Sequence, residues 1–97
     1  MIRSFADSAT EDIFNGIDSR PSRTRCPKPL WPVARRKLTQ INAVSDLKSL
    51  GVPPGNRLEA LRGDRVGQRS IRINDRYRIC FRWDDDGPHD VEIVDYH

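Results

Sequence analysis

The sequence predicts an α+β fold, in which an N-terminal strand and two helices pack on one face of a twisted antiparallel sheet of about four to five strands. Two patterns predict this class. Apolar residues follow helical spacing within residues 29–43, whereas residues 58–97 alternate apolar and polar side chains between short turns. The 97 residues suffice for one core, so we expect a single domain spanning residues 1–97.

The first part of the chain predicts a strand, a short helix and a loop. Residues 2–5 alternate apolar and polar side chains, as a half-buried strand does. Asp7 or Ser8 can cap a helix that ends near Gly16, because glycine readily adopts the conformation that closes helices. Residues 18–29 are rich in Pro, Ser and Arg and show no periodicity, which predicts a loop.

The second predicted helix runs from about Pro29 to Ala43, with one further turn at residues 45–50. The segments that follow alternate with a period of two, which predicts strands. These strand segments are residues 58–61, 68–74, 76–83 and 91–97. Along residues 76–83 the aromatic and isoleucine side chains are expected to face the core, and Arg78 and its neighbours on the other side are expected to face solvent.

Charges are sorted along the chain. Residues 57–82 contain eight arginines and three acids, whereas residues 84–97 contain six acids and no Lys or Arg. Fourteen of the 17 basic residues are arginine, whose planar fork of donors matches phosphate. This bias favours nucleic-acid binding. The alternatives are arginines that pair with the acidic tail across strands, and an acidic protein partner.

Several classes of protein and site are disfavoured. The longest apolar stretch is six residues and includes two prolines, so we expect no membrane-spanning helix and no membrane partner. The N-terminus lacks the features of a secretory signal, and the two cysteines lie far apart, which favours free thiols and a cytoplasmic location. The cysteines and the two histidines lack the short paired spacings of zinc sites, so neither a metal nor another cofactor is expected.

Two runs of the C-terminal half carry a family resemblance: LEALRGDRVGQRSIRINDRYRICFRW at residues 58–83 and DVEIVDYH at residues 90–97. Together they resemble the HigB branch of the RelE/ParE-like toxin superfamily, the killer components of plasmid and chromosomal toxin–antitoxin systems. The opening MIRSF also resembles the first strand of that branch. The resemblance covers the C-terminal half well and the helical half only in its layout.

The resemblance implies a compact microbial-ribonuclease-like fold and a metal-independent endoribonuclease, or mRNA interferase. Such toxins cut mRNA in the A site of the 70S ribosome by attack of the ribose 2′-OH on the adjacent phosphate, and so inhibit translation. A HigA-type helix-turn-helix antitoxin neutralises them, and operator DNA is contacted only through that antitoxin. The alternatives are a non-catalytic relative that binds RNA or its antitoxin, and a plain structural interaction protein.

The resemblance also marks candidate catalytic residues, namely Glu59, Arg62, Arg78, Asp95, Tyr96 and His97. Arg62 stands where many relatives carry lysine, and Glu59 stands where some carry histidine. An arginine stabilises charge but cannot donate a proton near neutral pH, whereas an ionised glutamate can accept one. The further arginines expected to bind RNA are Arg65, Arg69, Arg76 and Arg82.

Asp95 and His97 lie two residues apart, so along a strand their side chains project to the same face. Asp95 can then orient the imidazole of His97 and favour its protonated form, which suits a group that protonates the departing 5′-oxygen. Arg78 also has an alternative role, as the cross-strand partner of Glu92 or Asp95.

Overall fold

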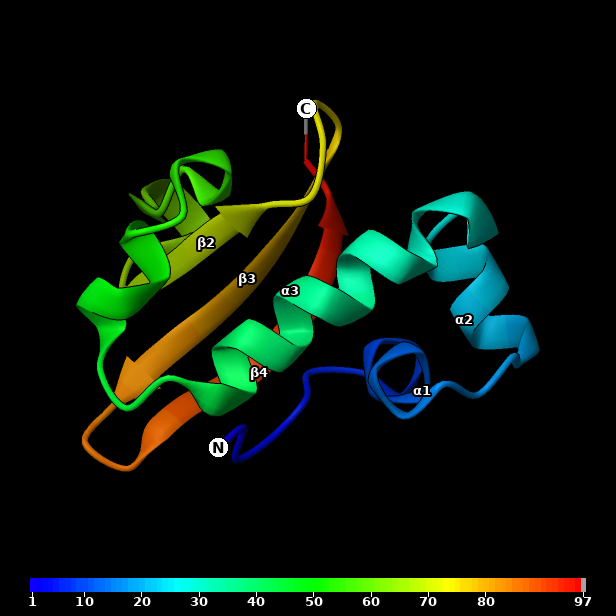
Figure 1. Ribbon diagram of the computed structural model, residues 1–97, viewed down its shortest axis with the longest axis horizontal. Coiled ribbons are helices and arrows are strands. Elements are labelled where there is room, and N and C mark those ends of the chain that lie inside the picture. Colours follow the sequence, from blue (N-terminus) through cyan, green and yellow to red (C-terminus); the bar gives the residue numbers. More distant parts are fainter. Residues whose placement is uncertain (97) are drawn as a thin grey trace.

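The computed structural model describes residues 1–96 and combines three α-helices with a four-stranded antiparallel sheet (Figure 1). The helices are α1 (Ser8–Asn15), α2 (Arg20–Arg25) and α3 (Trp31–Ala43). The strands, in the order in which they lie in the sheet, are β1 (Glu59–Ala60), β2 (Gln68–Arg72), β3 (Tyr77–Asp84) and β4 (Gly87–Asp95). Short 3-10 helices join them, namely η1 (Lys28–Leu30), η2 (Leu47–Gly51), η3 (Pro54–Asn56) and η4 (Gly63–Arg65). The predicted α+β class is confirmed.

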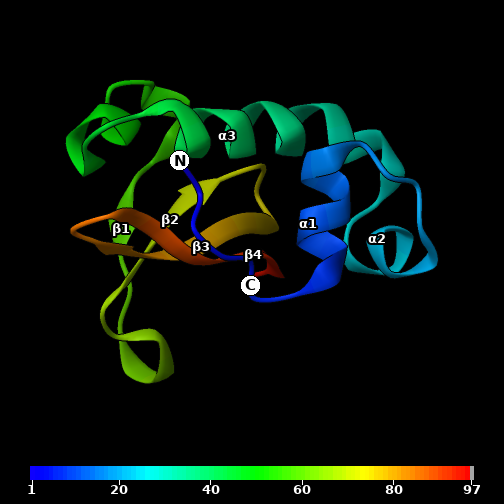
Figure 2. The same cartoon turned by 90° about the horizontal axis from the view of Figure 1, so that it is seen from below.

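One apolar core fills the space between α3 and the sheet, and Figure 2 shows α3 extended along one side of the strands. α3 contributes Ala34, Leu38 and Ile41, all fully buried. The fully buried apolar side chains that the strands contribute to this core cluster are Ile71, Ile79, Phe81, Val91 and Ile93. Full burial of one such large side chain stabilises a fold by roughly 1.5–3 kcal/mol. The helix predicted from 29 to 43 is confirmed, with η1 as its first turn.

Both ends of α1 follow from its sequence. The Thr10 amide donates a hydrogen bond to the Asp7 carboxylate at 2.6 Å, so Asp7 caps the first turn. Gly16 adopts a left-handed conformation, with φ of 75°, and ends the helix. The predicted helix is therefore confirmed. Within residues 1–96, no helix is long and apolar enough to cross a membrane.

The prediction of a loop at residues 18–29 is wrong for the middle of that segment, where α2 forms. The Ser22 amide donates to Ser19 Oγ at 3.2 Å and the Ser19 amide donates to Ser22 Oγ at 2.9 Å, which makes a reciprocal cap. Pro21 lies in the first turn, where its missing N–H leaves no bond unmade. Ser22 is fully buried, so packing completes a helix too short to form alone.

The N-terminal segment pairs with β4 over a shorter length than predicted. Phe5 and Val91 form a single parallel bridge. Around it, the Arg3 amide donates to the Pro88 carbonyl at 2.9 Å, and the Val91 amide donates to the Ser4 carbonyl at 3.1 Å. The segment thus covers one edge of the sheet without forming a full fifth strand.

The strand register separates the side chains of β3 onto two faces. Ile79 lies opposite Ile71 and Ile93 and faces the core under α3. Cys80 lies opposite Ser70 and Glu92 on the other side, which we call the open face.

The expectation that Arg78 faces solvent is wrong. Arg78 is only 8% exposed, and Ser70 and Cys80 beside it are fully buried. The segment that leads into β1 covers this part of the open face, because the Arg57 carbonyl accepts a hydrogen bond from the Arg78 guanidinium. Arg82, beyond a register shift in β3, is exposed as predicted.

The central position of Ile79 gives a test of the core. Ile79→Val should lower the free energy of unfolding by about 0.5–1.5 kcal/mol, because it removes one buried methylene group. Val66→Ala is the control: Val66 is 78% exposed, and its change should stay within about 0.5 kcal/mol. Urea unfolding followed by circular dichroism measures both. Equal losses in the two variants would contradict the described core.

Candidate active site

A groove beside β1 brings three of the predicted site residues together. Its cavity measures about 430 Å³ and is lined by Glu59, Ala60, Leu61, Arg62 and Tyr96, which we call the β1 groove. Glu59 and Arg62 come from β1 and the turn after it, and Tyr96 follows the end of β4. The Tyr96 amide donates to the Arg76 carbonyl at 2.7 Å, which holds this end of the chain beside β3.

Arg78 lies on the open face of β3, and β2 separates it from β1 and the groove. Its Nε donates to Ser70 Oγ at 2.7 Å, and Ser70 is the register partner of Glu59. Its Nη2 donates to the Arg57 carbonyl at 2.6 Å and to the Ser70 carbonyl at 3.3 Å. These acceptors are neutral, so Arg78 keeps an uncompensated positive charge close to Glu59.

Asp95 is held by Arg76, whereas the sequence suggests Arg78 as its cross-strand partner. Arg76 donates from Nε and Nη2 to the two carboxylate oxygens of Asp95, at 2.8 and 2.7 Å. These hydrogen bonds raise the pKa of Arg76 above its usual value. The expected contact between Asp95 and His97 cannot be followed, since His97 lies outside the described residues.

Three of the four arginines expected to bind RNA are paired with acids. Arg65 donates to Glu92 at 3.0 Å. Arg76 pairs with Asp95, and Arg82 pairs with Asp84 at 3.0 Å and also with Asp90. Arg69 instead contacts a backbone carbonyl. Cross-strand pairing thus cancels much of the charge that is sorted along the chain. Pairs this exposed contribute little to stability.

The remaining positive charge gathers around β1. Among the residues that the structure describes, four arginines of the 57–82 segment form no ion pair: Arg57, Arg62, Arg69 and Arg78. Arg62 lines the β1 groove, Arg57 precedes β1, and Arg78 lies on the same open face. Arg69 is the register partner of Phe81, so its side chain projects to the opposite face of the sheet. The unpaired arginines on the side of the β1 groove are therefore Arg57, Arg62 and Arg78.

Sequence reasoning missed Ser70 and the Arg57 carbonyl, which hold Arg78. Ser70 interrupts an alternation of isoleucine and arginine with a small hydroxyl residue, and that break is a usable signal. The role of Arg57 comes from its backbone, for which the residue type gives no signal.

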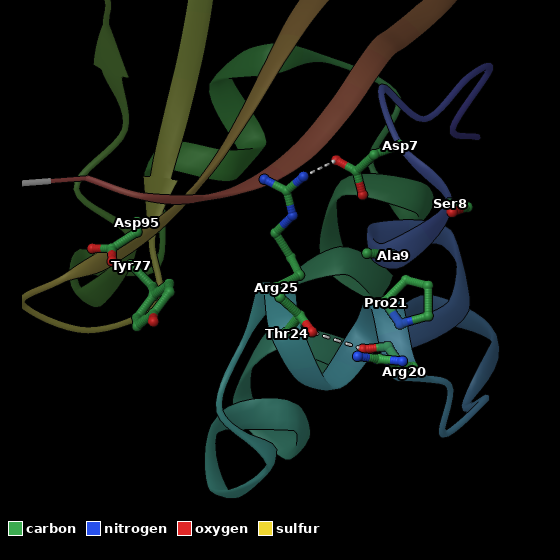
Figure 3. Close-up of a pocket in the computed structure, with 9 residues that line it drawn as sticks. All are labelled: Asp7, Ser8, Ala9, Arg20, Pro21, Thr24, Arg25, Tyr77 and Asp95. Carbon is green, nitrogen blue, oxygen red and sulfur yellow. Dashed lines mark hydrogen bonds and ion pairs between the residues drawn. The ribbon is translucent and has the colours of Figure 1, made fainter.

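A second cavity, larger than the β1 groove, lies elsewhere (Figure 3). It measures about 640 Å³ and is bounded by α1, α2 and the ends of β3 and β4. Arg25 on its wall forms ion pairs with Asp7 at 3.6 Å and Glu92 at 3.8 Å, and Asp95 pairs with Arg76. The charges of Asp7, Arg25 and Asp95 are thus compensated within the chain, and Arg20 is the wall residue without a carboxylate partner among residues 1–96. We assign no chemistry to this cavity.

Among residues 1–96, the side chains best placed for a metal lie where β3 turns into β4. Possible ligand atoms of Asp84, Asp86 and His89 lie within 4.8 Å of one another. Each atom already has a partner: Asp84 bonds Arg82 at 3.0 Å, and His89 bonds Asp86 at 2.6 Å. We assign no metal to this exposed cluster, and metal independence stays a prediction.

Comparison with known proteins identifies the family. Residues 3–97 match the family model described as the RelE-like toxin of the type II toxin–antitoxin system HigB. The chain belongs to this HigB-like toxin family. It is 46% identical over 85 residues to Toxin HigB-1 of Vibrio cholerae, a match that covers 88% of this chain and 86% of that protein. It is also 33% identical over 63 residues to an uncharacterised protein of Haemophilus influenzae, covering 65% and 62% of the two chains.

The thiols of this HigB-like toxin are poorly suited to nucleophilic chemistry. Cys80, on the open face, and Cys26, in the core, are both fully buried. Burial raises the pKa of Cys26 to about 11, and burial also raises the pKa of Cys80. Both groups are therefore neutral thiols in the folded protein near neutral pH.

This leads to a prediction on alkylation. Iodoacetamide at pH 8 should modify both cysteines far more slowly in the folded protein than in urea, because only unfolding exposes them and lowers their pKa to about 8.5. Mass spectrometry after timed quenching measures the rates. Modification of folded Cys80 at the unfolded rate would contradict its burial beneath the open face.

Proposed function

We propose that this HigB-like toxin is a metal-independent endoribonuclease that cuts mRNA in the ribosomal A site. The supporting observation is the group of unpaired arginines around the β1 groove, which also contains a carboxylate and a phenol. Cleavage through a 2′-OH creates additional negative charge on the phosphate. Fixed guanidinium groups stabilise that charge, and they do so most strongly where water is excluded.

Each groove residue has a proposed role in the reaction. Glu59 accepts the proton of the attacking 2′-OH, since an ionised carboxylate is an acceptor only. Arg62 and Arg78 stabilise the pentacoordinate phosphate, and neither can act as a general acid. Tyr96 donates its phenolic hydrogen to a phosphate oxygen. His97 protonates the departing 5′-oxygen.

The family also supports the proposed partners. We propose that a HigA-type helix-turn-helix antitoxin neutralises the protein, and that the protein contacts operator DNA only through this antitoxin. The 70S ribosome presents the mRNA, and the reaction takes place in the cytoplasm. Residues 1–97 form the single domain that carries it out. Type II toxins are defined by a protein antitoxin, so the family makes a partner of this kind the natural one.

Replacing Arg78 tests the proposed reaction. Arg78→Lys keeps the positive charge but loses the fork of donors, so cleavage should fall about 10²- to 10³-fold, as it does when one donor to a developing oxyanion is lost. Ends of messages mapped after induction in cells, together with growth, give the readout. Arg23→Lys, on the exposed surface of α2 and paired with Asp18, is the matched control and should cut as the parent does.

Two outcomes would contradict the proposal. Full cleavage by Arg78→Lys at equal abundance would remove Arg78 from the reaction. Growth arrest by the parent protein without new message ends would favour the non-catalytic relative that binds RNA or its antitoxin.

The salt dependence of RNA binding separates the β1 groove from the whole arginine-rich face. Three arginines bound to phosphates, namely Arg57, Arg62 and Arg78, should give a slope of log K against log salt of roughly −2, at about −0.7 for each phosphate of a single strand. All eight arginines of the segment would give roughly −6. Fluorescence anisotropy with a short uncleavable RNA, carrying 2′-O-methyl riboses, measures the slope. Binding that does not change with salt would refute the electrostatic interpretation.

A further inference from the structure

The guanidinium of Arg78 is fixed on two sides and open on the third. Its Nε and Nη2 donate to Ser70 Oγ, the Ser70 carbonyl and the Arg57 carbonyl. In the part of the chain that the structure describes, the two hydrogens of Nη1 have no acceptor. With the residue only 8% exposed, the side chain has little freedom to turn another edge toward a ligand.

The Arg57 carbonyl reaches Arg78 because of an unusual backbone conformation. Arg57 has φ of 45° and ψ of 58°, the left-handed region that residues other than glycine rarely adopt. Such conformations persist only where the surrounding structure enforces them, and they collect at functional sites. Here the conformation directs the carbonyl of a surface residue into the sheet, where it makes the shortest hydrogen bond to Arg78.

The residue before Arg57 anchors this corner to α3. Asn56 is fully buried, and its amide nitrogen donates to Gln40 at 3.1 Å and to the Leu50 carbonyl at 3.0 Å. Its amide oxygen accepts a hydrogen bond from the ammonium group of Lys37, which is also buried. The position of the Arg57 carbonyl is therefore determined by three elements: α3, η2 and η3.

We propose that Arg57 is a positioning residue for Arg78: its left-handed backbone, together with Ser70, fixes the guanidinium so that the Nη1 edge faces the RNA phosphate at the β1 groove. This role rests on the proposed ribonuclease function. In this role the carbonyl oxygen of Arg57 acts on Arg78, so removing the side chain of Arg57 leaves the guanidinium of Arg78 in position.

Two substitutions at one position separate the carbonyl from the side chain. Arg57→Gly and Arg57→Val remove the same charge, but only glycine adopts φ of 45° freely, and a β-branched residue resists it. We expect Arg57→Gly to cut RNA about 10²-fold faster than Arg57→Val at saturating substrate, because glycine keeps the guanidinium of Arg78 in place and a misplacement of about 1 Å costs about that factor. RNA affinity should be equal in the two variants, since both lack the Arg57 charge.

Arg78 itself provides the second readout. In the Arg78→Lys background, Arg57→Gly and Arg57→Val should cut equally, because the positioned group is gone. Hydrogen exchange of the Arg78 Nε–H, followed by NMR, should be slow in the parent and in Arg57→Gly and at least about tenfold faster in Arg57→Val, since hydrogen bonding protects against exchange. If Arg57→Val does not fold, Arg57→Ala, which disfavours the same conformation less strongly, replaces it in both measurements.

Equal cleavage by Arg57→Gly and Arg57→Val, or equal exchange of the Arg78 Nε–H in them, would overturn the positioning role. A parent protein that cuts no RNA would overturn the proposed function instead. In that case the exchange measurement still decides whether Arg57 positions Arg78.

Discussion

Arg78 places a permanent positive charge beneath the open face of the sheet, and its acceptors are all uncharged. A buried charge destabilises a fold unless its donors are satisfied. At Nε and Nη2 this requirement is met by Ser70 and by the Arg57 carbonyl, which accounts for Arg57 keeping a conformation that its residue type disfavours. Removing any of these partners would leave a buried donor without an acceptor. The corner before β1, the register of β2 and the position of the β1 groove are thus coupled through one side chain.

The arginines of the C-terminal half divide into two groups with different consequences. Those on the outer parts of β3, in η4 and after the β2–β3 turn are paired with acids of the same sheet, as Arg65 is with Glu92. Those around β1 have no carboxylate partner among the described residues. Composition gives only the total charge. Strand pairing determines where on the surface that charge remains, and in this HigB-like toxin it remains at the groove.

Periodic patterns allowed much of the fold to be predicted. The apolar stripe gave α3, the Asp7 and Gly16 caps gave α1, and alternation gave the sheet. α2 was missed because a short helix held by Ser19 and Ser22 has no periodicity to detect. The period of two also placed Arg78 on the correct face but could not reveal what covers that face. The groove residues followed from the family resemblance, whereas a carbonyl such as that of Arg57 carries no signature in the residue type.

The ion pairs beside the groove limit how much of a strand the protein could hold. Each carboxylate that holds an arginine competes with an incoming phosphate for the same guanidinium, and it does so at a local concentration that free RNA does not reach. Arg65 and Arg76 would therefore gain little by exchanging Glu92 and Asp95 for a phosphate. The footprint of a strand bound as proposed is then restricted to the few nucleotides beside the unpaired arginines.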